Sequence, residues 1–276
     1  MLYVYAVISA ALIPVLDRFF GVPILRQPYS LWLVPVMFVG TFLALVILTL
    51  GAVIIAYLFV DLGKPPRACR FYRKLTRFAL PFVCQVLRIK VKSTGDEVFP
   101  ESGRFVLVSN HTHLLDPVVY LGYYPEKDLA FIGKKEIVKS INIVAKVMWS
   151  TKGIFIDRDN LRSGAKGIID SIRMLKNGEV SMGIFPEGTR SKDGSVGEFK
   201  SGAVKIARKS GVPIVVCSIK GVTDVMHRFP FRSTTVYIDV LKRYDPDEIA
   251  ACDDESVSLE ARQLISDNLE KRNKEE

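Results

Sequence analysis

A histidine and an aspartate five residues apart are the clearest pair of chemically useful side chains in the sequence. They are His111 and Asp116, in the stretch SNHTHLLDP at residues 109–117. On a regular helix this interval leaves the two side chains about 140° apart, so they would not share a face. They meet only if the chain between them forms a loop or tight turn, where the carboxylate would fix the imidazole tautomer and raise its basicity as a general base. Asp116 followed by Pro117 also fits a helix N-cap and first turn, and the two roles are compatible.

Two further stretches place arginine where it can bind an anion. Arg158 follows the apolar run at residues 153–156, and its guanidinium can bind phosphate through two hydrogen bonds or pair with a neighbouring aspartate. The stretch FPEGTRS at residues 185–191 contains Arg190 and also Gly188, which permits close approach to the backbone. Taken alone, this stretch also fits an ordinary polar turn.

The remaining chemistry of the sequence is sparse. The stretch VPIVV at residues 212–216 is apolar and fits a wall better than a reactant. None of these stretches holds a cysteine or serine as an obvious nucleophile, so we expect no covalent intermediate. No cluster of histidines and carboxylates has metal-site spacing, so we expect no metal. Four widely separated cysteines fit reduced thiols rather than a disulfide scaffold: Cys69, Cys84, Cys217 and Cys252.

In this order and spacing, the four stretches resemble those of the glycerolipid acyltransferase family, and specifically the bacterial 1-acylglycerol-3-phosphate acyltransferases. The resemblance covers about residues 85–225, and the N-terminus is also similar to that family's membrane anchor. It implies His111 as the general base and Asp116 as its orienting partner. It implies a binding site for the acyl acceptor at Arg158, Glu187, Gly188, Thr189 and Arg190, with Lys134 as a further phosphate contact, and a wall for the acyl donor or acyl chain at Val212 and Pro213.

A second histidine departs from the family pattern. The family often has serine where this chain has His113, which places another imidazole two residues from the base. We assign the role of base to His111 because only this histidine has the required interval to Asp116.

The resemblance implies direct transfer of a fatty acyl group to the sn-2 hydroxyl of lysophosphatidate, giving phosphatidic acid. The donor would be acyl-CoA or acyl-carrier protein, and no bound cofactor is expected. One alternative is acylation of glycerol 3-phosphate or of another lysophospholipid. A second is a non-enzymatic membrane protein that binds anionic lipid through the same basic groups. A nucleic-acid partner is not expected, because no recognised nucleic-acid motif accompanies the basic charge.

The chain beyond about residue 87 alternates short apolar runs with helical patterns, which is typical of an α/β domain. We predict a mixed, mostly parallel central sheet flanked by helices. The near-continuous apolar run at 212–219 predicts a strand buried on both faces. The other expected strands are 88–92, 105–108, 129–132, 153–156, 182–185 and 236–240, and the expected helices are 161–175, 203–209 and a fraying polar helix from residue 256.

The first sixty residues hold most of the excess hydrophobicity in a chain that is 49% hydrophobic. Residues 31–60 contain no charged side chain, and about 20 apolar residues suffice to cross a bilayer, so we predict a transmembrane span there. The alternative is a buried core helix. Residues 1–25 fit a second span or a segment lying in the membrane interface. They fit a cleaved signal peptide less well, since they lack a basic N-terminal region.

A basic segment follows the predicted span. By the positive-inside rule it lies on the cytoplasmic side, in what we expect to be a bacterial cytoplasmic membrane. Its cations lie on one helical stripe beside aromatic residues: Arg70, Arg73, Lys74 and Arg77. This pattern predicts a helix lying among lipid headgroups. An amphipathic surface helix of the soluble domain is the alternative. Pro81 should kink or divide this helix.

The charge distribution separates two anionic partners. The formal net charge is +9, although residues 245–276 hold 4 basic and 11 acidic side chains. The basic charge therefore points to anionic headgroups at residues 61–92 and to a substrate phosphate at the motif arginines. The predicted organisation is a transmembrane anchor at 1–62, amphipathic interfacial helices at 63–88, an acyltransferase domain at 89–255 and a polar C-terminal helix or tail at 256–276.

Overall fold

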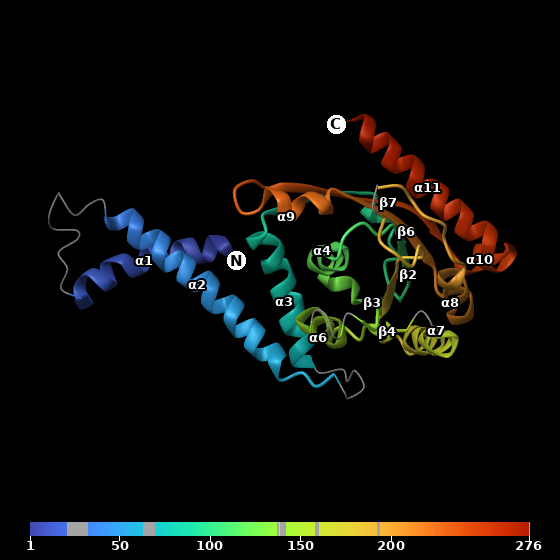
Figure 1. The fold of residues 1–276 in the computed structure, drawn as a ribbon, viewed down its shortest axis with the longest axis horizontal. Coiled ribbons are helices and arrows are strands. Elements are labelled where there is room, and N and C mark those ends of the chain that lie inside the picture. The colour runs from blue at the N-terminus through green and yellow to red at the C-terminus, as the bar shows by residue number, and fades with distance from the viewer. Residues whose placement is uncertain are drawn as a thin grey trace. The chain divides into compact units, whose positions relative to one another are not determined.

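The computed structural model describes residues 1–20, 33–62, 70–136, 138, 142–157, 160–191 and 194–275. They form two compact units, Met1–Val60 and Asp61–Glu276, which are drawn as ribbons in Figure 1. The predicted anchor boundary at residue 62 lies close to this division. Each unit is described by itself.

Two apolar helices form the first unit. α1 (Leu2–Phe20) and α2 (Leu33–Leu58) pack together, and the Tyr5 hydroxyl lies 2.6 Å from Thr49 Oγ1 across their contact. Both helices are long and apolar enough to cross a membrane, and most of their side chains are not buried inside the protein. The buried core helix that we considered for residues 31–60 does not form, because α2 buries only Val46 and Tyr57. Crossing of the bilayer by either helix stays a prediction.

The second unit begins with the basic amphipathic segment as a single helix, α3 (Arg70–Val86). Pro81 lies inside this helix and does not divide it. Leu80 joins the hydrophobic cluster on one face of the sheet and Phe82 is buried, whereas Phe71 and Phe78 are exposed. α3 therefore has one apolar face packed inward and two phenylalanines pointing to solvent.

A seven-stranded sheet organises the second unit, in the order β1-β7-β6-β2-β5-β3-β4. The five strands β2 to β6 are parallel to one another, whereas β7 is antiparallel to β6 and β1 is parallel to β7. The mixed, mostly parallel sheet is therefore confirmed. Its strands are β1 (Ile89–Thr94), β2 (Val106–Ser109), β3 (Leu129–Lys134), β4 (Ile154–Ile156), β5 (Ser181–Ile184), β6 (Ile214–Lys220) and β7 (Thr234–Tyr244).

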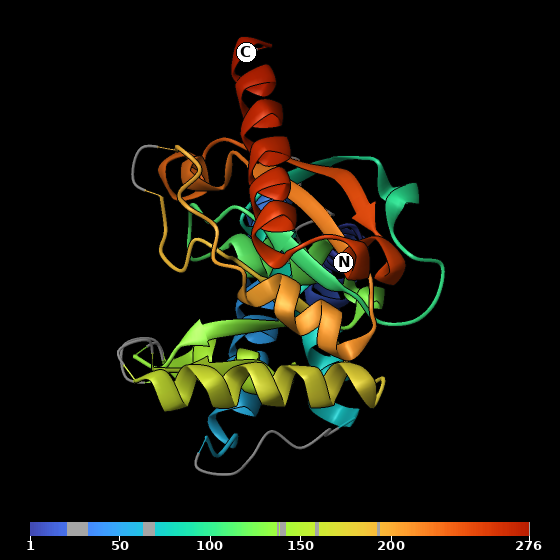
Figure 2. The ribbon, with the colours of Figure 1, turned by 90° about the vertical axis from the view of Figure 1, so that its right-hand side faces the viewer.

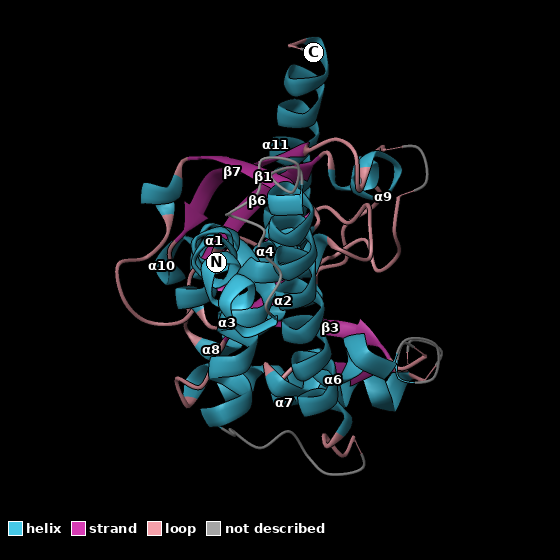
Figure 3. Ribbon diagram, turned by 90° about the vertical axis from the view of Figure 1, so that its left-hand side faces the viewer, coloured by secondary structure: helices cyan, strands magenta, loops and turns pink. Residues whose placement is uncertain are grey.

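Helices cover both faces of this sheet (Figures 1 and 3). One hydrophobic cluster joins a sheet face to α7 (Leu161–Lys176), α8 (Gly202–Ser210), α10 (Pro246–Ala251) and α11 (Asp254–Lys274). The other joins the opposite face to α3, α4 (Asp116–Tyr123), α6 (Asn142–Ser150) and α9 (Val225–Arg228). Because both faces are covered, β6 is buried along nearly its whole length, as its apolar run predicts.

The C-terminal helix differs from the expected fraying tail. α11 begins at Asp254, where Asp253 caps its first amides, and it contributes to the hydrophobic core. Its buried apolar residues recur every four positions: Val257, Ala261, Ile265 and Leu269. The predicted boundary between residues 255 and 256 therefore falls inside a helix of the domain, and the expectation of fraying is wrong.

The direction of the strands decides where the polar loops gather. In Figure 2 the arrow of β3 points to one side of the domain and that of β7 to the other. The segments that follow β2, β3, β4, β5 and β6 all leave the sheet at the same edge. In parallel sheets, ligands usually bind at this carboxyl edge.

Candidate active site

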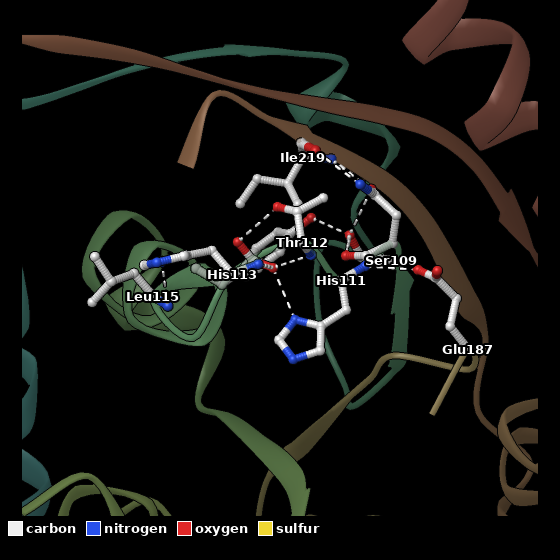
Figure 4. Close-up of polar contacts among 10 residues, drawn as sticks. Ser109, His111, Thr112, His113, Leu115, Glu187 and Ile219 are labelled. Atoms are coloured by element: carbon white, nitrogen blue, oxygen red, sulfur yellow. Dashed lines mark hydrogen bonds and ion pairs between the residues drawn. The ribbon is translucent and has the colours of Figure 1, made fainter. Parts of the chain in front are cut away.

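His111 and Asp116 meet at the carboxyl edge of the sheet. Figure 4 shows His111 there, in a network of polar contacts with its neighbours. β2 ends at Ser109 and α4 begins at Asp116, so a short loop separates them, as the five-residue interval requires. The His111 Nδ1 atom lies 2.8 Å from Asp116 Oδ2. Because an ionised carboxylate only accepts hydrogen bonds, Nδ1 carries the hydrogen and Nε2 is the unprotonated nitrogen of the neutral ring.

The Asp116 carboxylate is fully buried and held by the loop itself. Its Oδ2 also accepts hydrogen bonds from the backbone amides of Thr112, at 2.7 Å, and His113, at 2.8 Å. These donors satisfy the buried charge, and the nearby N-terminus of α4 favours it further. Asp116 is not the N-cap, since Leu115 occupies that position without a side-chain bond. The N-cap interpretation of the sequence is therefore wrong.

A buried asparagine anchors the base of the loop. Asn110 forms two hydrogen bonds of 2.9 Å with the backbone of Ile219 in β6, one as donor and one as acceptor. Beside it, the Ser109 hydroxyl lies 2.8 Å from the hydroxyl of Tyr120 in α4. Sequence reasoning did not single out Asn110, although a polar residue directly after an apolar strand was a usable signal.

The imidazole of His111 is also stacked on an aromatic ring. The centroids of the His111 and Phe185 rings are 4.2 Å apart with an interplanar angle of 14°, and Phe185 in turn stacks on Phe131. This stack and the bond to Asp116 together restrict the plane and the tautomer of His111, which is the preorganisation that a general base needs.

Glu187 lies against the backbone beside His111. Its Oε1 accepts the amide hydrogen of His111 at 2.8 Å, and its Oε2 accepts that of Gly197 at 3.0 Å. Within the same loop, the Ser191 amide donates to the His111 carbonyl at 2.8 Å. Both carboxylate oxygens thus accept backbone hydrogen bonds, so Glu187 ties the loop after β2 to the loop between β5 and α8 rather than facing an acceptor molecule.

The backbone at Gly188 turns through a positive φ of 72°, which favours glycine. Its amide donates to the Phe185 carbonyl at 3.1 Å. This amide is therefore engaged in the turn. It is not available to stabilise an oxyanion, a role that an unpaired glycine amide could otherwise take.

Two cations accompany this turn. Arg190 is exposed, and the Lys200 ammonium group lies close to Gly188, 3.7 Å from the position that a Cβ would take there. Among the residues that the structure describes, neither forms an ion pair. Thr189 is also exposed. Sequence reasoning missed Lys200, whose signal was its place directly before the helix that follows the turn.

His113 is turned to a different task from His111. Its Nδ1 accepts the amide hydrogen of Leu115 at 3.3 Å. Burial lowers the pKa of His113, and the positive charge of Arg190 lowers it further, against the opposing effect of Asp116. His113 is therefore kept neutral beside the base.

The other expected binding residues divide between two edges. Lys134 ends β3 at the carboxyl edge, where its ammonium lies 3.7 Å from a carboxylate oxygen of Glu136. Arg158 lies outside the described residues, although β4 ends at Ile156 at this same edge.

Val212 and Pro213 lie at the opposite edge. The Pro213 carbonyl accepts the amide hydrogen of Val106, which begins β2. The structure therefore separates both residues from His111 by the length of a strand.

The buried cysteines are unsuited to nucleophilic chemistry. Burial raises the pKa of the Cys84 thiol to about 12 and also raises that of Cys217. Both thiols remain protonated near neutral pH, which disfavours thiolate attack.

Comparisons of the sequence and the fold with known proteins point to one family. The family model described as acyltransferase matches residues 90–220. A 1-acyl-sn-glycerol-3-phosphate acyltransferase of Borreliella burgdorferi is 30% identical over 186 residues, covering 66% of this chain and 72% of that protein. The human 1-acyl-sn-glycerol-3-phosphate acyltransferase alpha is 32% identical over 142 residues, covering 51% of this chain and 50% of that protein. The chain thus spans about half the length of the human relative.

A solved structure agrees with the sequence relatives. The crystal structure of the 1-acyl-sn-glycerophosphate acyltransferase PlsC from Thermotoga maritima is 28% identical, with a TM-score of 0.58, and the match covers 81% of this chain and 88% of that one. These findings confirm the resemblance inferred from the motifs. The chain belongs to the glycerolipid acyltransferase family and is an acyltransferase.

Proposed function

We propose that the protein transfers a fatty acyl group from a thioester donor to the sn-2 hydroxyl of 1-acylglycerol 3-phosphate, giving phosphatidic acid. The observation that supports this most is the His111–Asp116 pair, at the same edge as cations that have no ion-pair partner among the described residues. A general base and an adjacent anion site are what acylation of a phosphorylated alcohol needs.

The base in this proposal is Nε2 of His111. It takes the proton of the acceptor hydroxyl as that oxygen attacks the thioester carbonyl, and Asp116 stabilises the resulting imidazolium. The new C–O bond forms, the C–S bond breaks, and the imidazolium returns the proton to the leaving thiolate. Acyl-CoA and acyl-carrier protein are both thioesters, so the same step serves either donor.

The acceptor phosphate is bound by the cations around the turn after β5. Arg190 and Lys200, on either side of Gly188 in the sequence, are the principal partners, and Lys134 contributes from the end of β3. Arg158, which lies outside the described residues, is assigned the same role from its sequence motif. Binding a phosphate at this distance from the base holds the neighbouring hydroxyl near Nε2, which lowers the entropic cost of the reaction. Thr189 is retained as an additional polar contact.

The membrane supplies this acceptor. α1 and α2 would anchor the chain, and the exposed Phe71, Lys74 and Phe78 of α3 would lie among anionic headgroups. Two other cations of the predicted basic stripe, Arg73 and Arg77, pair with Asp128 of the same unit instead. In this proposal the acyltransferase domain lies on the cytoplasmic side of a bacterial cytoplasmic membrane, which the basic residues that follow the apolar helices support through the positive-inside rule.

The acceptor and the donor are tested together by initial rates of the full-length protein in vesicles. Lysophosphatidate, glycerol 3-phosphate and a zwitterionic lysophospholipid are compared with acyl-CoA and with acyl-carrier protein. We expect the highest kcat/KM with lysophosphatidate, because it alone joins the phosphate dianion to a membrane-bound acyl chain. A higher kcat/KM with glycerol 3-phosphate would contradict the proposal and indicate that the protein acylates glycerol 3-phosphate instead.

A further inference from the structure

The segment between β6 and β7 leaves the sheet at the catalytic edge. It runs through a short turn at Val222–Asp224 and α9 (Val225–Arg228) to the start of β7 at Thr234. Figure 2 shows α9 on the side of the domain to which the β3 arrow points. β6 is also the direct neighbour of β2, and His111 lies in the loop that follows β2.

This segment is buried where it joins the domain and has an exposed apolar tip at Met226 and Phe231. Val222 and Val225 are fully buried, which holds the segment on the domain. Phe231, by contrast, is 88% exposed and Met226 is 55% exposed. Exposed apolar side chains are common singly, so these two gain significance only from the charged residues that accompany them in the same segment.

Cations accompany the exposed tip in the same segment. Arg228 and Arg232 are exposed within the segment, while the acid Asp224 lies 3.2 Å from Arg228. At its base, the Thr234 amide donates to the carbonyl of Arg88, another exposed cation. Aromatic and apolar side chains among arginines fit an anionic lipid surface, where rings enter the interface and guanidinium groups bind phosphates.

The segment that carries the tip is linked to the amphipathic helix α3 and acts electrostatically on the loop that holds His111. Arg88 lies two residues after the end of α3, so its hydrogen bond with Thr234 joins the start of β7 to the C-terminal end of the amphipathic helix. His227 in α9 is also among the groups that lower the pKa of His113, after burial, Arg190 and His111. α9 is therefore within electrostatic reach of the loop that holds His111.

We infer that residues 222–233 form a second lipid-binding element, which inserts Met226 and Phe231 into the interfacial layer of an anionic bilayer beside the catalytic edge. The inference rests on the proposed membrane-bound acceptor, because the element would shorten the path of that acceptor from the bilayer to His111. It is separate from the anchoring that α1 and α2 would provide.

Lipid contact is measured without turnover, by spin labels on the full chain in vesicles of phosphatidylethanolamine and phosphatidylglycerol. Cys69 and Cys252 are replaced by serine, and the buried Cys84 and Cys217 stay in place. One cysteine is then introduced as Phe231→Cys, with Leu259→Cys as the control, since Leu259 is 63% exposed on α11. We expect the label at 231 to be more accessible to oxygen than to a water-soluble nickel complex, and the label at 259 to show the reverse. Equal, water-like accessibility at both positions would overturn the inference.

Kinetics provide the second readout. Phe231→Ser should raise the apparent KM for lysophosphatidate in vesicles about tenfold, since it removes burial of one aromatic ring. The same variant should leave kcat/KM unchanged for a short-chain, water-soluble lysophosphatidate, and Leu259→Ser should change neither. An equal loss with both acceptors would indicate a structural role and contradict the inference. If the wild-type protein acylates no lysophosphatidate, the proposed function fails while the spin-label result still decides lipid contact.

Discussion

Glu187 accepts a hydrogen bond from the backbone amide of His111 at 2.8 Å, so a residue from the loop after β5 fixes the backbone of the proposed base after β2. The second oxygen of the same carboxylate holds Gly197. This bridge explains why a glutamate lies inside a turn that otherwise offers cations to an anionic substrate. A carboxylate facing the phosphate would repel it, whereas one occupied by amides serves as a support.

Glu187→Gln tests this supporting role. The amide keeps one acceptor but turns an N–H donor toward a backbone N–H, so one bond is lost and a donor is left unpaired. We expect the free energy of unfolding to fall by about 1–3 kcal/mol. We also expect kcat to fall about tenfold, with a smaller change in KM for the acceptor, because the base is misplaced rather than the phosphate site removed. A rise in KM for the acceptor without a fall in kcat would contradict this role and indicate that Glu187 contacts the acceptor.

Lys200→Met tests the phosphate site at a residue that the motifs did not identify. Removing its charge should raise KM for lysophosphatidate about tenfold, as expected for one charge-assisted hydrogen bond. Lys205→Met is the matched control, because Lys205 is exposed on α8. Equal KM values for the two variants would exclude Lys200 from the site, and Arg190→Met should behave like Lys200→Met.

The lowered pKa of His113 predicts how the stability of the protein changes with pH. Its pKa is lowered in the folded state, so below the ordinary value of about 6.5 the unfolded chain binds the proton more readily than the folded chain. The contribution of neutral His113 is therefore fully present above pH 6.5 and declines as the pH falls below it. In thermal melts between pH 5.5 and 7.5, His113→Gln should lose less Tm on acidification than the wild type. An identical pH dependence in both proteins would contradict the lowered pKa.

The sequence predicted the local geometry of the base better than its long-range supports. The interval from His111 to Asp116 excludes a shared helical face, and the loop follows from that alone. Asn110 was missed because its partner, Ile219, is far along the chain and becomes adjacent only when β2 pairs with β6. Lys200 was missed for the same reason, since only the folded turn brings it over Gly188.

Two other differences come from direction and periodicity. Val212 and Pro213 precede their strand, whereas His111 follows its own, and parallel pairing then sends them to opposite edges. The motif order contains no information about strand polarity. In α11, the buried stripe includes Ala261 among many charged residues, so the helix reads as a polar tail although Ile265 is fully buried. The family resemblance, the mixed sheet and the doubly buried β6 were all correctly predicted.

The most direct test of the central claim compares thiol release by His111→Ala and His113→Ala under saturating donor and acceptor. General-base catalysis contributes about 10²- to 10⁴-fold, so we expect His111→Ala to lose at least the lower value in kcat while its thermal unfolding stays close to that of the wild type. His113→Ala should retain kcat within about tenfold, because its Nδ1 accepts only a backbone amide hydrogen. Near-normal kcat in His111→Ala, or the larger loss in His113→Ala, would contradict the assignment of His111 as the base.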